Sequence, residues 1–213
     1  MGFWSRLFGA ETRTSKLSGD SPYLPKKSDE VEVIFAKLFT KKGGKFIYSE
    51  DKKSSDHYFK LILDENHWKN EDILCFDKNL SDRFHIICQP TNIELNEFKV
   101  FLISCEYLIA NKGTILICNH QLKDFKLDNL PPYIIVYSGL NKFVNDVSEG
   151  MTSLKNKYSD RLPSNITTLN VKNSVDEKDF LSYGNSAKSL YFCLLYTSPS
   201  PRDATLSRMP SSA

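Results

Sequence analysis

The sequence predicts a layered α/β domain built on a mostly parallel sheet. Short apolar runs of strand length alternate along the chain with segments whose apolar residues recur at three- and four-residue steps. Strands that alternate with amphipathic helices are typical of a sheet covered by helices, in which crossovers join parallel strands. The chain has 213 residues, of which 40% are apolar and 25% charged, and this fits one globular domain with a substantial core.

Composition excludes several functional classes. The formal net charge is only +2, which argues against a dedicated nucleic-acid-binding protein. No stretch approaches the roughly 18 consecutive apolar residues of a membrane span. The five cysteines form no C-x-x-C pair and no cluster with zinc spacing. We therefore expect a cytoplasmic protein with buried free thiols, no metal, no nucleic acid and no transmembrane segment.

The first half of the domain is expected to alternate helix and strand. A helix is predicted to begin at Asp29 with Glu32 as its capping-box partner, and a glycine pair ends it. A second helix, capped by Ser54 or Ser55, runs to about residue 67. Apolar runs at residues 46–48, 73–76 and 84–88 are predicted strands, because each is short and bounded by polar or proline residues.

The second half contains the clearest pattern in the chain. Apolar runs at residues 98–104 and 113–118 are predicted strands, joined by residues 105–112. A further strand follows two prolines and covers residues 133–137. Residues 140–158 carry a regular apolar stripe that predicts an amphipathic helix. The last strand is expected at residues 189–192.

Both ends of the chain are expected to lie outside the folded domain, which is predicted over residues 29–192. Residues 1–28 are interpreted as a flexible tail and linker. Within them, Phe3, Trp4 and Phe8 could form an apolar face that touches a membrane surface or a partner, although a loose tail is favoured. Residues 193–213 resemble a translated sequencing adapter and are interpreted as a non-native tail, so the natural end after Phe192 is left open.

No nucleotide, metalloprotease or hydrolase motif is present, so candidate site residues come from local segments. Glu106 follows an apolar strand, and open α/β sheets bind ligands at the carboxyl ends of their strands. The turn that follows offers Asn111, Gly113 and Thr114 as polar or backbone donors. The alternative is that Glu106 is a solvated edge residue and that the glycine only shapes the turn.

A second polar segment lies nearer the carboxyl terminus. Ser164, Asn165 and Thr167 offer uncharged donors at the mouth of a sheet, which suits the binding of a carboxylate or phosphate. The same residues suit an ordinary loop that satisfies its own backbone, and this reading is slightly favoured. Residues 184–186 are interpreted as a turn.

In order and spacing, these segments resemble the LUD-domain family, in particular the branch that includes lactate utilization protein C. The family pattern Ile-Ala-x-Thr-Gly-Thr/Ser corresponds to residues 109–114, with Lys112 in place of the usual threonine. Leu130–Pro131, the Ser-Asn-Ile-Thr segment at 164–167 and the glycine pair at 43–44 also match. Residues 170–178 depart from the family pattern, which indicates a divergent bacterial member.

The resemblance implies a fold like that of the sugar-phosphate isomerase and coenzyme A transferase superfamily. It implies an accessory, non-catalytic role in the oxidation of L-lactate to pyruvate, beside iron–sulfur oxidoreductase subunits that carry the cofactors. The chain itself is expected to hold no cofactor. In the alternative, the protein is a small-molecule-binding protein or an acyl or coenzyme A transferase, with Glu106 as nucleophile. The supporting donors would be Asn111, Gly113, Thr114 and Asn165. The sequence leaves open whether Lys112 and the altered 170–178 segment abolish a family site.

Overall fold

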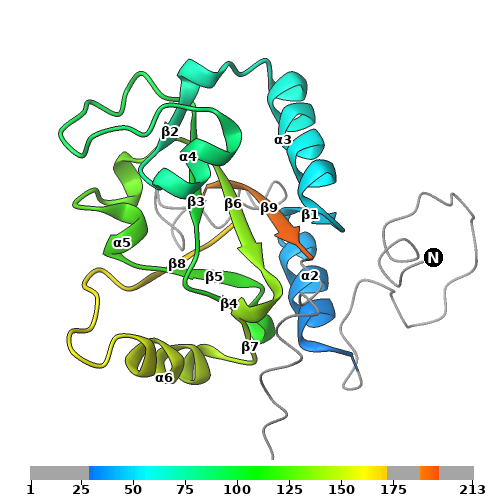
Figure 1. Ribbon diagram of the computed structural model, residues 1–213. Coiled ribbons are helices and arrows are strands. Elements are labelled where there is room, and N and C mark those ends of the chain that lie inside the picture. Colours follow the sequence, from blue (N-terminus) through cyan, green and yellow to red (C-terminus); the bar gives the residue numbers. More distant parts are fainter. Residues whose placement is uncertain (1–28, 172–187, 197–213) are drawn as a thin grey trace, which may run out of the picture.

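The protein is built on two sheets that pack face to face (Figure 1). The computed structural model describes residues 29–171 and 188–196. The first sheet has five parallel strands in the order β1-β9-β6-β3-β2. Their bounds are β1 (Lys45–Ser49), β2 (Ile73–Cys75), β3 (Val100–Ser104), β6 (Tyr133–Gly139) and β9 (Ser189–Leu195). The predicted fold class, with its mostly parallel central sheet, is confirmed.

The second sheet is mixed, and only one of its strands, at Thr114–Ile117, was predicted. It has the order β7-β4-β5-β8, in which β5 is antiparallel to both neighbours and β7 is parallel to β4. Its strands are short: β4 (Tyr107–Ile109), β5 (Thr114–Ile117), β7 (Phe143–Val144) and β8 (Thr167–Leu169). The other three strands have only two or three residues each, which is too short for a periodic pattern that would distinguish them from loops.

Helices cover the outer faces of the two sheets. The main helices are α2 (Val31–Lys41), α3 (Lys52–Asn66), α4 (Lys78–Phe84), α5 (Asn119–Leu122) and α6 (Val147–Lys157). Single 3₁₀ turns are η1 (Asn70–Asp72), η2 (Ala110–Lys112), η3 (Leu127–Asn129) and η4 (Leu140–Lys142). Helices α3 and α4 pack on the first sheet, and α6 packs beside the second. Helix α2 contacts β1, β7 and η2, at the side of both sheets.

The central strands bury both faces, and their residues alternate between two cores. In β3, Phe101 and Ile103 face the second sheet, whereas Val100 and Leu102 face α3 and α4. Strands β6 and β9 follow the same two-residue alternation. A parallel strand covered on both faces therefore appears in the sequence as a continuous apolar run, and such runs were the most reliable signal.

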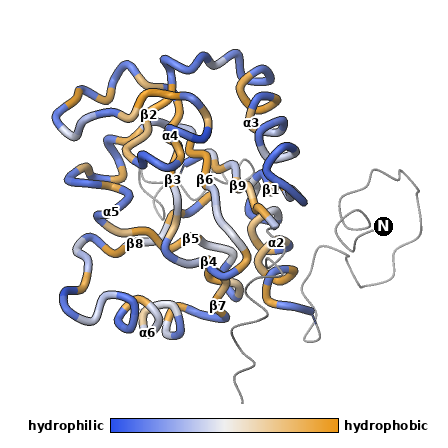
Figure 2. The backbone as a smooth tube through the Cα atoms, in the orientation of Figure 1, coloured by the Kyte–Doolittle hydropathy of each residue, from blue (hydrophilic) through white to orange (hydrophobic). Residues whose placement is uncertain are grey.

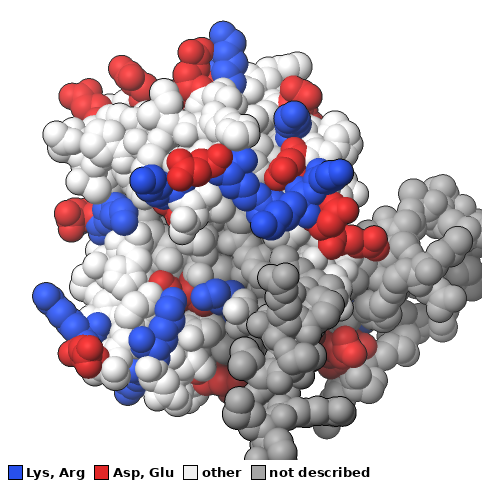
Figure 3. Space-filling view, viewed as in Figure 1, with Lys and Arg blue, Asp and Glu red and all other residues white. Residues whose placement is uncertain are grey.

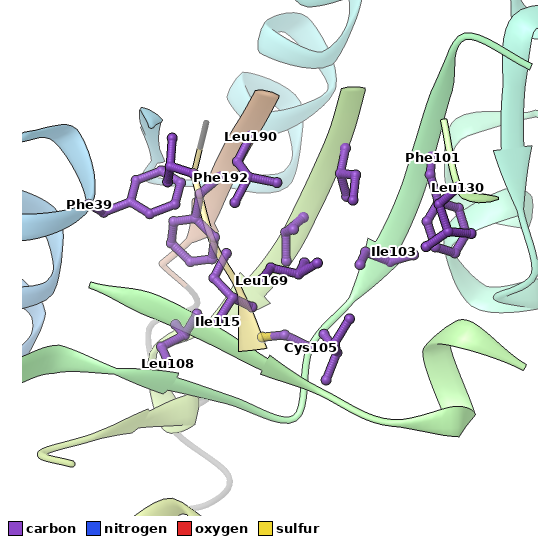
Figure 4. Close-up of a cluster of buried hydrophobic side chains, with 14 of the residues drawn as sticks. Phe39, Phe101, Ile103, Cys105, Leu108, Ile115, Leu130, Leu169, Leu190 and Phe192 are labelled. Atoms are coloured by element: carbon purple, nitrogen blue, oxygen red, sulfur yellow. The ribbon is translucent and has the colours of Figure 1, made fainter. Parts of the chain in front are cut away.

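The larger core lies between the two sheets. Figure 4 shows Phe192 and Leu190 of β9 meeting Ile115 of β5 and Leu169 of β8, with Phe39 of α2 closing one side. The rings of Phe39 and Phe192 are 5.9 Å apart at their centroids in an edge-on arrangement. Along the backbone, hydrophobic residues are concentrated in the strands and in α2 (Figure 2).

Helix starts differ from the predicted ones. The first helix has Glu30 at its N-cap, with no side-chain cap hydrogen bond, because Asp29 pairs with Lys37 at 2.7 Å instead. The second helix is capped by Asp51, and Ser54 is its reciprocal partner in a capping box. Its predicted end is confirmed, since His67 occupies the C-cap in a left-handed conformation.

Two further predictions were wrong. The strand expected at residues 84–88 is absent: Phe84 ends α4, which Asp77 caps, and Cys88 is exposed. The other four cysteines are buried free thiols, as expected. The helix expected over residues 140–158 covers only Val147–Lys157, since Leu140, Phe143 and Val144 lie in a 3₁₀ turn and in β7.

The last strand also extends beyond its predicted end. Strand β9 continues to Leu195, and Cys193 and Leu194 are buried and paired with β1. The folded region therefore ends at least three residues later than the predicted boundary at Phe192. The adapter origin of residues 193–213 stays a prediction. Residues 197–213, the tail over 1–28 with Phe3, Trp4 and Phe8, and residues 172–187 lie outside the described part.

Within the described ranges, no helix combines the length and apolar character needed to cross a membrane.

Candidate ligand-binding site

A cavity of about 540 Å³ opens at the carboxyl ends of three neighbouring strands, β2, β3 and β6. These strands are parallel and in register, so the residues that follow them emerge on one edge of the first sheet. Parallel α/β sheets place ligands at this edge. The lining comes from those strand ends and from α4, α5, η4 and α6; its residues are Phe76, Asp77, Lys78, Leu102, Ile103, Ser104, Cys105, Glu106, His120, Gln121, Lys123, Tyr137, Ser138, Gly139, Lys142, Lys157 and Tyr158.

Glu106 is the charged residue deepest in this wall. It lies two residues past the end of β3, and its backbone N–H donates to Leu116 O at 2.9 Å, which fixes it at the start of β4. Its side chain is only 2% exposed. The prediction that Glu106 lies at the carboxyl end of a strand is therefore confirmed, and the alternative of a solvated edge residue is wrong.

Three side chains satisfy the buried carboxylate. Lys157 Nζ donates to Oε2 at 2.7 Å. Gln121 Nε2 donates to Oε1 at 3.0 Å. The Tyr158 hydroxyl lies 3.1 Å from Oε1 and 3.3 Å from Oε2. A buried charge is tolerated only when it is paired and hydrogen-bonded, and both conditions are met here.

These contacts decide the ionisation of the pair. Burial on its own would raise the pKa of Glu106, but the hydrogen bonds from Lys157 and Gln121 outweigh burial and lower the pKa to about 2. Burial likewise opposes the charge of Lys157, yet the hydrogen bond to Glu106 raises the pKa of this lysine. At neutral pH the pair is therefore a carboxylate and an ammonium.

Cys118 and His120 complete the neighbourhood of Glu106. Cys118 Sγ lies 3.5 Å from Oε1, and His120 Nδ1 lies 3.8 Å from the same oxygen. A carboxylate, a thiol and an imidazole at this spacing could ligate a metal ion. However, Lys157 already supplies the cation, and burial, reinforced by the Glu106 carboxylate, raises the pKa of Cys118 to about 11. The arrangement therefore fits a hydrogen-bonded ion pair better than a metal centre.

The rim of the cavity carries further positive charge. Lys78 is exposed and Lys123 and Lys142 are half-buried, and within the described ranges no ion pair joins any of the three to a carboxylate. The second acid of the lining, Asp77, is occupied: one oxygen caps α4 and the other accepts from Ser104 Oγ at 3.1 Å. The cavity is thus a cationic one.

The other predicted site residues lie elsewhere. Gly113 and Thr114 are at the far end of the β4–β5 hairpin, where the turn packs against α2. Asn111 N donates to Asn145 O at 3.0 Å, and Asn111 is exposed. The substituted Lys112 offers its carbonyl to Lys42 Nζ at 2.7 Å. The structure does not bring this turn to the cavity.

The 164–167 segment is nearer to the site but does not line it. Ser164 O accepts from Asn119 N at 3.0 Å at the start of α5, and Thr167 pairs with Ile117 in the second sheet. Asn165 is exposed, with a left-handed φ of 54°. The segment behaves as a loop that positions α5, which is the reading that the sequence slightly favoured.

Several residues of the site were missed from the sequence. Gln121, Lys157 and Tyr158 converge on Glu106 from separations of 15, 51 and 52 residues. Tyr158 lies at the end of the predicted apolar stripe, and no sequence motif includes His120. The one sequence signal for Tyr158 was its place at the end of the predicted apolar stripe, because apolar residues of an amphipathic helix pack against other elements.

Fold and site together define a layered α/β domain with a cationic ligand cavity at the carboxyl edge of a parallel sheet. Residues 87–189 match the family model of the LUD domain. The match includes Glu106, Gln121, Lys157 and Tyr158.

A solved structure supports the same fold. The chain is similar to a crystal structure of a DUF162 family protein from Deinococcus radiodurans, with a TM-score of 0.57 and 14% sequence identity. The similarity covers 81% of this chain and 100% of that chain. No curated protein is significantly similar in sequence.

Proposed function

We propose that the protein is an accessory subunit of bacterial L-lactate utilization and that its LUD domain binds an anion in the Glu106 cavity. The observation that carries the ligand part is the group of lysines without carboxylate partners at the carboxyl edge of the sheet. The lactate part is supported by the LUD domain and by the motifs that resemble the branch containing lactate utilization protein C. Iron–sulfur oxidoreductase subunits would carry the electrons.

The ion pair at the base of the cavity supports binding rather than covalent chemistry. A carboxylate nucleophile needs a free lone pair that faces the substrate. Both oxygens of Glu106 already accept hydrogen bonds, and Lys157 holds one of them at 2.7 Å. In this role Glu106 positions Lys157 and Tyr158 at the cavity wall.

A reconstitution experiment tests the role in lactate oxidation. The tagged full chain is co-expressed with the iron–sulfur oxidoreductase subunits of a bacterial lactate-utilization system, and L-lactate-dependent reduction of an electron-accepting dye is measured. We expect co-purification, and loss of most of the activity when the chain is omitted. Partners that oxidise lactate equally well without the chain, and that do not bind it, would contradict the proposal.

The second candidate is an acyl or coenzyme A transferase that uses Glu106. Its supporting observation is that Glu106 is ionised and lies in the wall of a cavity. Under this candidate, Glu106→Gln abolishes acyl exchange between thioesters and leaves partner binding intact. Exchange that survives the substitution, or that the unmodified chain never shows, rejects it.

A further inference from the structure

We infer that the cavity ligand is an organic molecule with two or more negative charges, phosphorylated or polycarboxylic, rather than a monocarboxylate such as lactate. This inference deepens the proposed function in one respect, since it rests on the cavity being the ligand site. It does not depend on which partner proteins the chain serves.

Charge is the first argument. Four lysines from four separate elements line one cavity: Lys78 from α4, Lys123 from the end of α5, Lys142 from η4 and Lys157 from α6. Only Lys157 has a carboxylate partner in the described part. Elsewhere, lysines such as Lys45 and Lys99 have carboxylates at 3.4 and 2.9 Å. Like charges repel, so three lysines around one cavity favour a ligand that neutralises more than one of them.

The lysines reach the cavity from different parts of the fold. Lys157 is tied to Glu106 at the base, and Lys142 Nζ lies 5.8 Å from the centroid of the Tyr107 ring. Lys78 follows β2, and Lys123 follows α5. A molecule with two or more anionic groups can pair with more lysines of the lining than a single carboxylate can.

Size and lining give the second argument. A cavity of about 540 Å³ lies in the range of about 300–1,000 Å³ that suits drug-sized ligands, so a three-carbon acid would leave most of it empty. One wall is apolar or aromatic, with Phe76, Leu102 and Tyr137. Gln121, Ser138 and Tyr158 add uncharged polar groups. This combination suits a molecule with an organic body and several anionic groups.

His120 adds a polar side chain to the cavity lining. Its side chain is 46% exposed, and Nδ1 lies 3.0 Å from the Tyr158 hydroxyl. The imidazole therefore connects solvent to the Glu106 network at the cavity wall.

Calorimetric titration of the full chain with three probes tests the inference. Pyrophosphate represents phosphorylated ligands, citrate represents polycarboxylates, and L-lactate represents monocarboxylates. We expect at least one multiply charged probe to bind about tenfold or more tightly than lactate at low ionic strength, and its affinity to fall as salt is added. The tighter of pyrophosphate and citrate identifies the anionic group. Lactate binding as tightly as both, or no binding of either, would overturn the inference.

Matched lysine variants locate the binding. Lys78→Gln combined with Lys142→Gln is expected to weaken the tighter probe by about tenfold, because two cations are removed from the cavity. Lys60→Gln is the control, since Lys60 is exposed on α3 and does not line the cavity. Equal affinities for the double variant and the control would place the anion elsewhere. The reconstitution assay reads the lactate role separately, so either proposal can fail alone.

Discussion

Glu106 shows how one residue determines the character of the site. Its carboxylate is nearly inaccessible, yet it remains charged, because a lysine, an amide and a phenol converge on its two oxygens. Removing one member of such a network leaves the others buried without a partner, and that desolvation is what destabilises the protein.

The Glu106→Gln substitution is therefore expected to lower the free energy of unfolding by about 2 kcal/mol. The amide keeps the shape but turns a donor or a weaker acceptor toward Lys157. Urea unfolding followed by circular dichroism measures the change. Glu65→Gln is the matched control, because Glu65 is 66% exposed and pairs with Lys45 at 3.4 Å; its effect should stay below about 0.5 kcal/mol. Equal effects of the two substitutions would contradict the assignment.

The lowered pKa of Glu106 also predicts a dependence of stability on pH. The group has an ordinary pKa of 4.5 and a folded-state pKa of about 2. Its contribution to the free energy of unfolding, at most about 3 kcal/mol, is fully present above pH 4.5 and is lost as the pH falls from 4.5 toward 2. Unfolding free energies measured at pH 6, 4 and 3 should fall more steeply for the unsubstituted chain than for Glu106→Gln. If the unfolding free energies of the two proteins fell in parallel with pH, Glu106 would have the same pKa in the folded and unfolded states.

At the scale of elements, the sequence predicted the strands that are buried on both faces. The runs that became β2, β3, β6 and β9 are continuous and apolar, so their type was clear. The run at residues 84–88 was wrongly predicted to be a strand. Its first residue, Phe84, instead ends a helix and packs on Tyr137, with ring centroids 4.8 Å apart. The expected helix over 140–158 was too long, because residues of η4 and β7 happen to continue the stripe of α6.

The packing of the β4–β5 turn against α2 can be tested by substitution. Gly113 has φ +55°, and a Cβ there would lie 2.6 Å from Phe39 N and 2.8 Å from Leu38 C, both backbone atoms of α2. Gly113→Ala is therefore expected to destabilise the protein by about 2 kcal/mol or more, measured by thermal or urea unfolding.

Gly150→Ala in α6 is the contrasting variant. A Cβ at Gly150 would meet only ordinary contacts at 3.4 and 3.6 Å, and alanine is the better helix former. Its stability should be unchanged or higher by up to about 1 kcal/mol. If Gly113→Ala were as mild as Gly150→Ala, the close approach of the turn to α2 would be wrong.

At the scale of the whole molecule, the fold brings together site residues that lie far apart in the sequence. A carboxylate after an apolar strand was recognisable as a candidate, because its place at a sheet edge follows from local pattern alone. Its partners were not recognisable, since α5 and α6 return to the same edge only after crossing the second sheet. The turn at Gly113 was misleading for the opposite reason: its glycine is required by packing against α2, not by a ligand.

Strand β9 lies between β1 and β6, so the pairing of β1 with the rest of the first sheet depends on it. Leu194 is fully buried in the core between the sheets. Leu194→Ala should cost about 2–5 kcal/mol of unfolding free energy, whereas Leu61→Ala, on the exposed side of α3, should cost less than about 1 kcal/mol. A Leu194→Ala variant as stable as the unsubstituted chain would show that β9 ends before this residue.

Charge on the molecular surface is mixed rather than concentrated. Figure 3 shows basic and acidic side chains interspersed over one face, with basic groups over α6 at its lower edge. The net charge of +2 is small, so the excess of lysines around the cavity is a local property. Long-range attraction of anions to the whole protein would therefore be weak, and binding should be confined to the cavity.

An NMR titration of the ¹⁵N-labelled full chain with pyrophosphate tests most directly whether this cavity is the ligand site. We expect the largest amide shift changes at the carboxyl edge of the first sheet, at Ser104, Glu106 and Gly139, and we expect these changes to saturate together. Largest changes at the Gly113 turn, or small changes scattered over exposed lysines, would contradict it.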